Sequence, residues 1–264
     1  MSVHSKMTAI ADAIRGKTGG TNPLTLDQMA TAIAEIQTGG GGGDNTLLES
    51  IVMGTATSVS LGEQVTKIKD HLFENVTTLK EFDFSHIQAI RTEAFKGCTG
   101  LTDIYLPAIV KNANHGSRAF QGCTSLKRVS LPIMTGWYSA AGGWFSGCSS
   151  LTDVDVPELT AVAAQLFTGC TALKKLDLPK VNSLGASCFQ GCTALTALIL
   201  RNNAVVTLAN INAFTNTPFA SGGTGGTVYV PAALIESYQT ATNWSTLYAS
   251  GTCNFAAIEG SEYE

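Results

Sequence analysis

Cysteine is the residue type in this chain with the widest chemistry, since a thiolate can ligate a metal, attack an electrophile or form a disulfide. Five of the 7 cysteines recur once in each copy of a repeated phrase: Cys98, Cys123, Cys148, Cys170 and Cys192. If the repeats stack as coils, these side chains are parallel and about 4.8 Å apart, wider than the roughly 3.5–4.5 Å between the Cβ atoms of a disulfide. We therefore expect each to be buried as a small apolar residue that donates a weak S–H hydrogen bond to a turn.

The remaining cysteines and the histidines give no recognisable catalytic or metal-binding pattern. Cys188 and Cys192 have the spacing of a metal pair, but both fit the repeat and no histidine is near them in the sequence. Cys253 has no explanation in the repeat. The histidines form no Ser-His-Asp, Cys-His or His-Glu-x-x-His signature. They are His4, His71, His86 and His115.

Gly16-Lys17-Thr18 has the ending of a phosphate-binding loop without the rest of it. Such a loop needs a glycine five residues before Gly16, where the chain has Ala11, and a strand before that. We therefore predict that the chain is not an enzyme and that it holds no cofactor and no metal.

Aspartates recur at positions that we expect to point outward from a strand in each repeat. One outward column holds Asp83, Tyr105, Ser130, Asp155, Asp177, Ile199 and Tyr229, and a second holds Asp103, Arg128, Asp153, Lys175 and Ala197. Calcium is disfavoured because Arg128 and Lys175 interleave with the carboxylates and no Asp-x-Asp-x-Asp-Gly loop exists. We expect a solvated face of mixed charge, with these candidate ligand-binding residues: Tyr105, Arg128, Asp153, Asp155, Lys175 and Asp177.

Two neighbouring repeats carry extra residues that we expect to emerge side by side at one edge. The segments from Pro107 to Phe120 and from Pro132 to Phe145 are longer than the corresponding segments of the two repeats that follow. Exposed aromatic and amide side chains suit recognition of sugars or peptides. The candidate ligand-binding residues at this edge are Asn112, Asn114, His115, Trp137 and Tyr138. The alternative is that Trp137 and Tyr138 only cover the edge of the core.

The elements that must position these residues are marked by phenylalanine. A period of about 22–25 residues separates Phe73, Phe95, Phe120, Phe145, Phe167, Phe189 and Phe214. From Phe95 to Phe189 each begins the phrase Phe-x-Gly-Cys-[Ser/Thr]-x-Leu. A fixed period in this range indicates a solenoid in which each repeat is one coil.

A second phrase, Leu-x-x-[Ile/Val/Leu]-x-[Leu/Val]-Pro, follows each Gly-Cys. Its last two apolar positions are two residues apart, which is strand spacing, and the proline ends the strand. Four copies end at Pro107, Pro132, Pro157 and Pro179, whereas the fifth has Arg201 instead. We therefore predict one short parallel β-strand in each coil of about 22–25 residues, joined by irregular or short helical returns.

The two phrases together resemble the leucine-rich repeats of the BspA-like family over roughly residues 65–258. The segment from Val228-Tyr229-Val230-Pro231 to Trp244 also resembles that family's C-terminal cap. The resemblance implies a leucine-rich-repeat solenoid and a non-catalytic surface or adhesive protein.

The residues before the solenoid predict a separate structural unit, an α-helical hairpin over residues 1–37. Leu26, Met29, Ile33 and Ile36 form an apolar stripe at helical spacing, and Thr25 with Gln28 is typical of a capping box. A hairpin this small lacks the core to be stable alone, so it should self-associate or dock on a larger body. We expect a Gly-rich linker at 38–46, the solenoid at 47–258 with its cap at about 226–258, and a tail at 259–264.

The stretch Ile10-Ala11-Asp12-Ala13-Ile14 and the residues up to Ala30 resemble an N-terminal module of phage and prophage structural proteins of Gram-positive gut bacteria. The resemblance implies an attachment element that carries a distal binding domain. Residues 1–21 contain no continuous apolar segment of a secretory signal peptide. We therefore expect a protein made in the cytoplasm without a signal peptide and found in a virion, or at the cell surface.

The composition of the chain limits the classes of partner that we expect. The net charge is −4 and only 14% of the residues are charged, which disfavours nucleic acid as a partner. No run of about 20 apolar residues predicts membrane insertion. The partners we expect are a bacterial surface protein or glycan, and a virion or a second copy of the chain through residues 1–37, which makes a homo-oligomer an option.

Three functions remain open from the sequence. The first is a phage or prophage tail protein that recognises a bacterial surface through the solenoid. The second is a cellular BspA-like surface adhesin of a gut bacterium, and the third is a structural spacer without a ligand.

Overall fold

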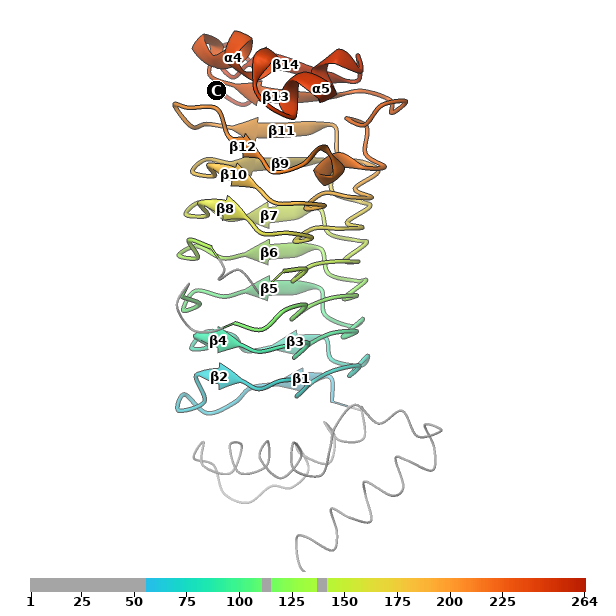
Figure 1. Ribbon diagram of the computed structural model, residues 1–264. Coiled ribbons are helices and arrows are strands. Elements are labelled where there is room, and N and C mark those ends of the chain that lie inside the picture. The colour runs from blue at the N-terminus through green and yellow to red at the C-terminus, as the bar shows by residue number, and fades with distance from the viewer. Residues whose placement is uncertain (1–55, 111–114, 137–141) are drawn as a thin grey trace, which may run out of the picture.

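A stack of about eight coils forms the body of the protein (Figure 1). The computed structural model describes residues 56–110, 115–136 and 142–264. The stack confirms the predicted leucine-rich-repeat β-solenoid with parallel strands. The expected hairpin at 1–37 and linker at 38–46 lie outside the described residues.

One column of strands runs along the whole stack. Its members are β1 (Ser58–Val59), β3 (Glu81–Phe82), β5 (Asp103–Tyr105), β6 (Arg128–Ser130), β7 (Asp153–Asp155), β9 (Lys175–Leu178), β11 (Ala197–Leu200), β13 (Gly226–Val230) and β14 (Cys253–Ala257). They pair in parallel as β1-β3, β5-β6-β7 and β9-β11-β13-β14. The register joins equivalent residues of successive repeats, for example Tyr105, Ser130 and Asp155. The outward columns expected from the sequence are therefore real neighbours, and we call this side the strand face.

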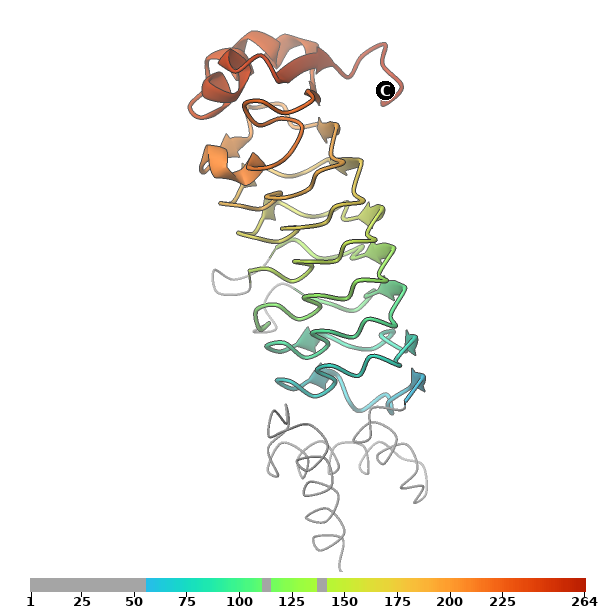
Figure 2. The same ribbon diagram turned by 90° about the vertical axis from the view of Figure 1, so that its right-hand side faces the viewer.

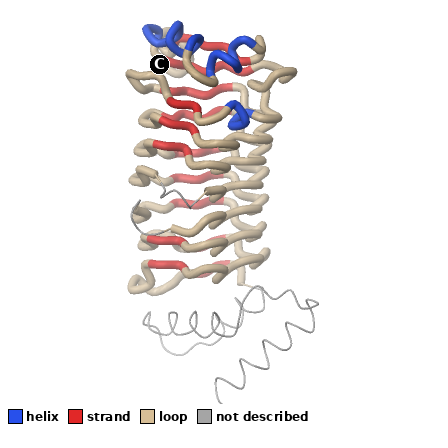
Figure 3. The backbone as a smooth tube through the Cα atoms, viewed as in Figure 1, coloured by secondary structure: helices blue, strands red, loops and turns tan. Residues whose placement is uncertain are grey.

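A second column of two-residue strands lies on another side of the stack (Figure 3). It contains β2 (Lys67–Ile68), β4 (Ala89–Ile90), β8 (Ala161–Val162), β10 (Ser183–Leu184) and β12 (Thr207–Leu208). The sequence predicted irregular returns here, and that part of the prediction was incomplete. Strands of two residues bury one or two side chains each, which is too short to produce a recognisable alternation.

Stacked phenylalanines fill the core beneath the turns. All seven are fully buried, and the ring centroids of successive members are 5.0–6.1 Å apart. In six coils the phenylalanine N–H also donates to a carbonyl of the next coil at 2.8–3.0 Å. Each coil is therefore tied to its neighbour by ring packing and by backbone hydrogen bonds at the same residue.

A left-handed backbone conformation lies on both sides of each of these phenylalanines except Phe214. Two residues after it, φ is +73° at Gly122 and +74° at Gly191, which explains the glycine of the repeated phrase. Asparagine, the non-glycine residue best suited to this conformation, replaces it at Asn75 and Asn216. Two residues before it, most of the residues with positive φ are not glycine, as at Glu93. The side chains before the phenylalanine consequently form a column of their own at the surface.

The C-terminal end of the stack is closed by η1 (Ile211–Phe214), η2 (Ala232–Leu234), α4 (Ile235–Thr240), α5 (Trp244–Ala249) and the last two strands. Trp244 and Tyr238 are fully buried. The Trp244 indole donates to the Val206 carbonyl at 2.7 Å, and the Tyr238 hydroxyl accepts from the Val206 N–H at 2.9 Å. These bonds satisfy the backbone next to β12, which is the last strand of the second column and has no further strand to pair with.

The phenylalanine column yields a stability prediction. Phe167→Ala should lower the free energy of unfolding by about 3–5 kcal/mol, because a rigid stack cannot collapse around the cavity. Urea unfolding followed by circular dichroism measures this. Lys174→Ala, at an exposed position just before β9, is the control and should change stability by no more than about 0.5 kcal/mol. Equal stability of the two variants would contradict the proposed role of the ring column.

Candidate functional site

All seven thiols are free and buried. The five thiols of the repeat have equivalent hydrogen-bond partners in successive coils. Each repeat cysteine donates its S–H to the carbonyl of the phenylalanine one coil earlier, at 2.9–3.3 Å. This confirms the predicted structural role. Burial raises the pKa of Cys98, Cys148 and Cys192 to about 12, so their thiols stay protonated. Burial also raises the pKa of Cys253, on β14, to about 12.

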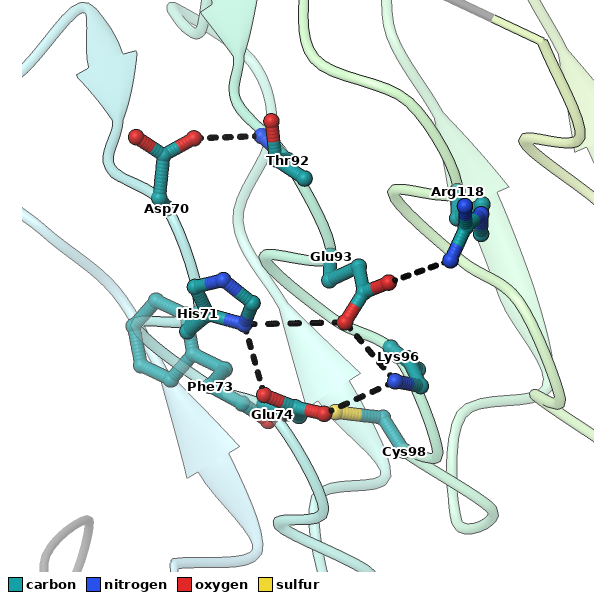
Figure 4. Close-up of polar contacts among 9 residues, drawn as sticks. All are labelled: Asp70, His71, Phe73, Glu74, Thr92, Glu93, Lys96, Cys98 and Arg118. Atoms are coloured by element: carbon teal, nitrogen blue, oxygen red, sulfur yellow. Dashed lines mark hydrogen bonds and ion pairs between the residues drawn. The ribbon is translucent and has the colours of Figure 1, made fainter. Parts of the chain in front are cut away.

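A cluster of charged side chains crosses the turns of three successive coils (Figure 4). We call it the turn-face cluster and define it as His71, Glu74, Glu93, Lys96 and Arg118. His71 Nδ1 lies 2.7 Å from Glu74 Oε2. Lys96 Nζ lies 3.1 Å from Glu74 and 2.7 Å from Glu93. Arg118 Nη1 lies 3.0 Å from the other oxygen of Glu93.

The repeat itself builds this cluster. His71, Glu93 and Arg118 occupy the positive-φ position two residues before successive phenylalanines. Glu74 and Lys96 directly follow two of those phenylalanines. Stacking therefore places opposite charges on adjacent coils.

The cluster has atoms that could ligate a metal ion, but its carboxylates are already paired with cationic side chains. One atom each from His71, Glu74 and Glu93 lie within 4.8 Å of one another. However, both carboxylates already face Lys96, and Glu93 also faces Arg118. A divalent cation would have to displace the ammonium group, so we interpret the cluster as an ion-pair network that ties coils together.

The strand face has a groove where β5, β6 and β7 lie side by side. Its volume is about 340 Å³, and the middle residues of the three strands, Ile104, Val129 and Val154, run along its base. The side chains of Ile104 and Val129 are buried in the core, so the base is mainly strand backbone. Its walls are the outward residues of the three strands: Asp103, Tyr105, Arg128, Ser130, Asp153 and Asp155. We call this the strand-face groove. The structure thus brings together four of the six strand-face residues that the sequence singled out.

Polar contacts fix most of the groove's walls and leave one aromatic side chain free to contact a partner. Arg128 pairs with Asp103 across the two strands, and Ser130 Oγ donates to Asp155 at 2.8 Å. The hydrogen bonds from Thr102 and Arg128 lower the pKa of Asp103, so it is charged at neutral pH. Tyr105 remains 60% exposed, the highest value among the exposed large hydrophobic residues of the described chain.

The other two strand-face residues lie further along the stack and have different contacts. Lys175 Nζ is 5.9 Å from the centroid of the Tyr263 ring. Asp177 accepts from Arg201, with the shortest distance 2.8 Å. These two residues therefore belong to a neighbouring surface, not to the groove.

The predicted ligand-binding edge is only partly described. Asn112, Asn114, Trp137 and Tyr138 lie outside the described residues. His115 is 7% exposed, with Nε2 at 2.7 Å from the Val110 carbonyl and its ring 5.2 Å from that of Trp144. The structure thus gives His115 a packing role. Trp144 is also packed in the core and donates its indole N–H to Gly116 at 2.7 Å.

Sequence reasoning missed two sets of contacts. The turn-face cluster corresponds in the sequence to polar residues two positions before and one position after the phenylalanines, and their order along the chain gave no sign of pairing across coils. The contacts of Tyr263 with the strand face join residues far apart in the sequence, and Arg201 precedes Tyr263 by 62 residues, so no local pattern could reveal them.

The buried thiols generate a reactivity prediction. A thiol of pKa about 12 is ionised to roughly one part in ten thousand at about pH 8, and only the thiolate attacks a disulfide reagent. The native chain should therefore not react with an aromatic disulfide reagent, while all 7 thiols should react in guanidinium. Stoichiometric labelling of the native chain would contradict the assignment.

The turn-face cluster generates a pH prediction. Burial by itself raises the pKa of Glu93, but the hydrogen bond and charge of Lys96, with His71 and Arg118, lower it below its ordinary 4.5. A lowered carboxyl pKa adds stability above about pH 4.5 that is lost as the pH falls. Lys96→Met should thus cost about 1 kcal/mol at about pH 7 and less at about pH 4, because the stabilisation diminishes once the pH is below the ordinary pKa of 4.5. Urea unfolding at both values measures this, with exposed Lys174→Met as the control. An equal loss at both values would contradict it.

Within the described part of the chain, no helix has the length and apolarity needed to cross a membrane. Comparison with curated proteins finds no match.

Solved structures of other leucine-rich repeat proteins are similar to this chain. A leucine-rich repeat protein from Bacteroides ovatus ATCC 8483 has 23% identity and a TM-score of 0.43, over 67% of this chain and 55% of that one. A leucine rich cell surface protein from Faecalibacterium prausnitzii A2-165 has 26% identity and a TM-score of 0.48, over 68% and 56%. The T. pallidum leucine-rich repeat protein has 21% identity and a TM-score of 0.37, over 77% and 74%. The chain thus spans little more than half the length of the first two.

A family model described as "BspA type Leucine rich repeat region (6 copies)" matches residues 53–136 and 116–224. The matched residues do not include the N-terminal stretch that resembles phage proteins, and the comparisons give that resemblance no support. They cover more than half of the chain and contain the phenylalanine column, the repeat cysteines and the strand-face groove. The chain belongs to the BspA-type leucine-rich repeat family.

Proposed function

We propose that this protein is a non-catalytic adhesion protein of the bacterial cell surface that binds a partner polypeptide through the strand-face groove. The observation that carries the proposal is the groove across β5, β6 and β7, with the exposed Tyr105 ring in its wall. Tyrosine and arginine are among the residues that most often dominate the energy of protein interfaces. The groove has both, in Tyr105 and Arg128.

Other exposed apolar side chains lie on the coils that carry the groove. Three of the large hydrophobic side chains that the structure shows as exposed, Tyr105, Val110 and Ile133, lie on the two coils that carry the extra residues. Val110 is 41% and Ile133 48% exposed. The Val110 N–H donates to the Gln88 carbonyl beside β4, so Val110 lies on the side of the second strand column and is not part of the groove.

The mixed charge of the groove favours a polypeptide over a glycan. Asp153 and Asp155 stand beside Arg128, so the walls offer both signs of charge within one groove. A peptide can match this pattern with its own charged side chains, whereas a neutral sugar cannot. A glycan ligand is the alternative that the experiment below separates.

Cell-surface adhesion is the function that the family membership favours over a phage tail. The Faecalibacterium prausnitzii relative is described as a cell surface protein, and no comparison points to a virion. Attachment or self-association through residues 1–37, including assembly in a virion or a homo-oligomer, stays a prediction. Light scattering with and without those residues tests it.

Binding of the fluorescently labelled chain to a panel of bacterial cells tests the proposed function. Tyr105→Ala should weaken binding at least about tenfold, the loss typical of a central interface tyrosine. The melting temperature should not change, because Tyr105 makes little contact with the core. Tyr248→Ala is the matched control, since Tyr248 is 40% exposed on the cap, away from the groove.

Treatment of the cells identifies the ligand class. Protease treatment should abolish binding if the ligand is a polypeptide. Loss after glycosidase treatment alone would show a glycan and overturn that part of the proposal. Binding to no cell type would favour a structural spacer, and equal binding by Tyr105→Ala and the unmodified chain would remove the groove as the site.

A further inference from the structure

Residues 259–264, expected from the sequence to be a tail, fold back over the strand face; we call them the cover segment. In Figure 2 the marked C-terminus lies on the side of the stack that carries a column of arrows. The Tyr263 ring meets the Tyr229 ring edge to face, with centroids 4.6 Å apart. Its backbone carbonyl accepts from Arg201 Nη2 at 2.7 Å. The Lys175 ammonium group lies 5.9 Å from the same ring.

The surface under the cover segment differs from the rest of the strand face. Ile199 points outward in register between Asp177 and Tyr229, yet it is only 1% exposed. The equivalent positions in earlier coils are polar, apart from exposed Tyr105. We define the covered patch as Lys175, Ile199, Arg201 and Tyr229.

Arg201 gives the covered patch a fixed hydrogen-bond donor. In the four preceding coils this position is proline, which cannot donate. Asp177 holds the Arg201 guanidinium through Nε at 3.1 Å and Nη2 at 2.8 Å. The Nη2 group that reaches the Tyr263 carbonyl is therefore positioned by the sheet itself, independently of the cover segment.

The contacts of the cover segment define a ligand chemistry. The patch supplies the Tyr229 ring and the apolar Ile199 side chain. It also supplies the Arg201 guanidinium, which donates a hydrogen bond to a peptide carbonyl, and the Lys175 ammonium group. The segment supplies a tyrosine between two exposed carboxylates, Glu262 and Glu264. The Lys175 ammonium group favours the face of an aromatic ring. The Arg201 charge is paired with Asp177, and the Glu264 carboxylate accepts from the Gly260 N–H within the segment, so the ring and the peptide carbonyl of Tyr263 are the groups that the patch holds.

We propose that the covered patch is a second peptide-binding site of the strand face, which takes a tyrosine side chain and its peptide carbonyl from a partner polypeptide. The cover segment fills this site in cis and is displaced when the partner binds. The proposal rests on the proposed function in one respect, that the strand face recognises polypeptides, and it adds the chemistry of one ligand.

Because the cover segment is attached to the chain, a partner needs a higher affinity to displace it from the patch. A short tether gives an effective concentration in the millimolar range, so weak peptides are excluded while the cover segment is seated. Removing the tyrosine from the segment should open the site without altering the fold, because Tyr263 lies at the surface of the stack.

The test measures fluorescence anisotropy of a labelled peptide with the sequence of residues 258–264. Full-length Tyr263→Ala should bind it saturably, and the unmodified chain should bind at least about tenfold more weakly because its own segment competes. Arg201→Gln in the Tyr263→Ala chain should weaken binding at least about tenfold, since the positioned guanidinium donor is gone. A peptide in which alanine replaces the tyrosine is the control ligand and should not bind.

Further variants separate the outcomes. Tyr105→Ala combined with Tyr263→Ala should keep full peptide binding, so failure of the groove proposal and failure of this one are distinguishable. No saturable binding to Tyr263→Ala, or equal binding to the unmodified chain, would overturn the inference. Concentration-dependent dimerisation of the unmodified chain that Tyr263→Ala abolishes would assign the segment to a second copy and overturn its placement in cis.

Discussion

Burial of one phenylalanine per coil, stacked on those of the coils before and after, is the interaction on which the rest of this structure depends. A single coil encloses too few side chains to form a core, so its ring must pack against its neighbours. The backbone N–H of the same residue donates a hydrogen bond to the next coil. Its carbonyl accepts a hydrogen bond from the cysteine thiol of the following repeat. Ring packing, backbone pairing and cysteine burial are thus satisfied together at one position.

Outward strand positions are free of this constraint, and the candidate binding surfaces lie there. Tyr105, Arg128 and Asp155 can vary without disturbing the core because their side chains leave the sheet on the side opposite to it. The turn side of the coils is also variable, but its charges in the first coils neutralise one another in the turn-face cluster. Charge on that side ties coils together. On the strand face Arg128 also pairs with Asp103, but both side chains stay exposed to a partner.

The side chains that the sequence marks as candidates for chemistry or binding include several that the fold buries and so makes unreactive. The repeat cysteines are buried and protonated, and His115 and Trp144 hold the backbone of neighbouring coils. The period alone predicted the role of the cysteines, because residues at one repeat position must share one environment. It could not predict the burial of His115, which stands among residues that the other repeats lack.

The sequence by itself determined the coil, its strand register, the buried columns and the outward columns, since each follows from a period that every repeat obeys. Tertiary structure decided which outward residues act together. The groove exists because β5, β6 and β7 align Tyr105 with Ser130 and Asp155. The covered patch exists because residues 259–264 return to the strand face, where Tyr263 meets a residue 62 positions earlier. Contacts between residues at equivalent repeat positions can be predicted from periodicity, whereas contacts made by a non-repeating segment depend on the path of the whole chain.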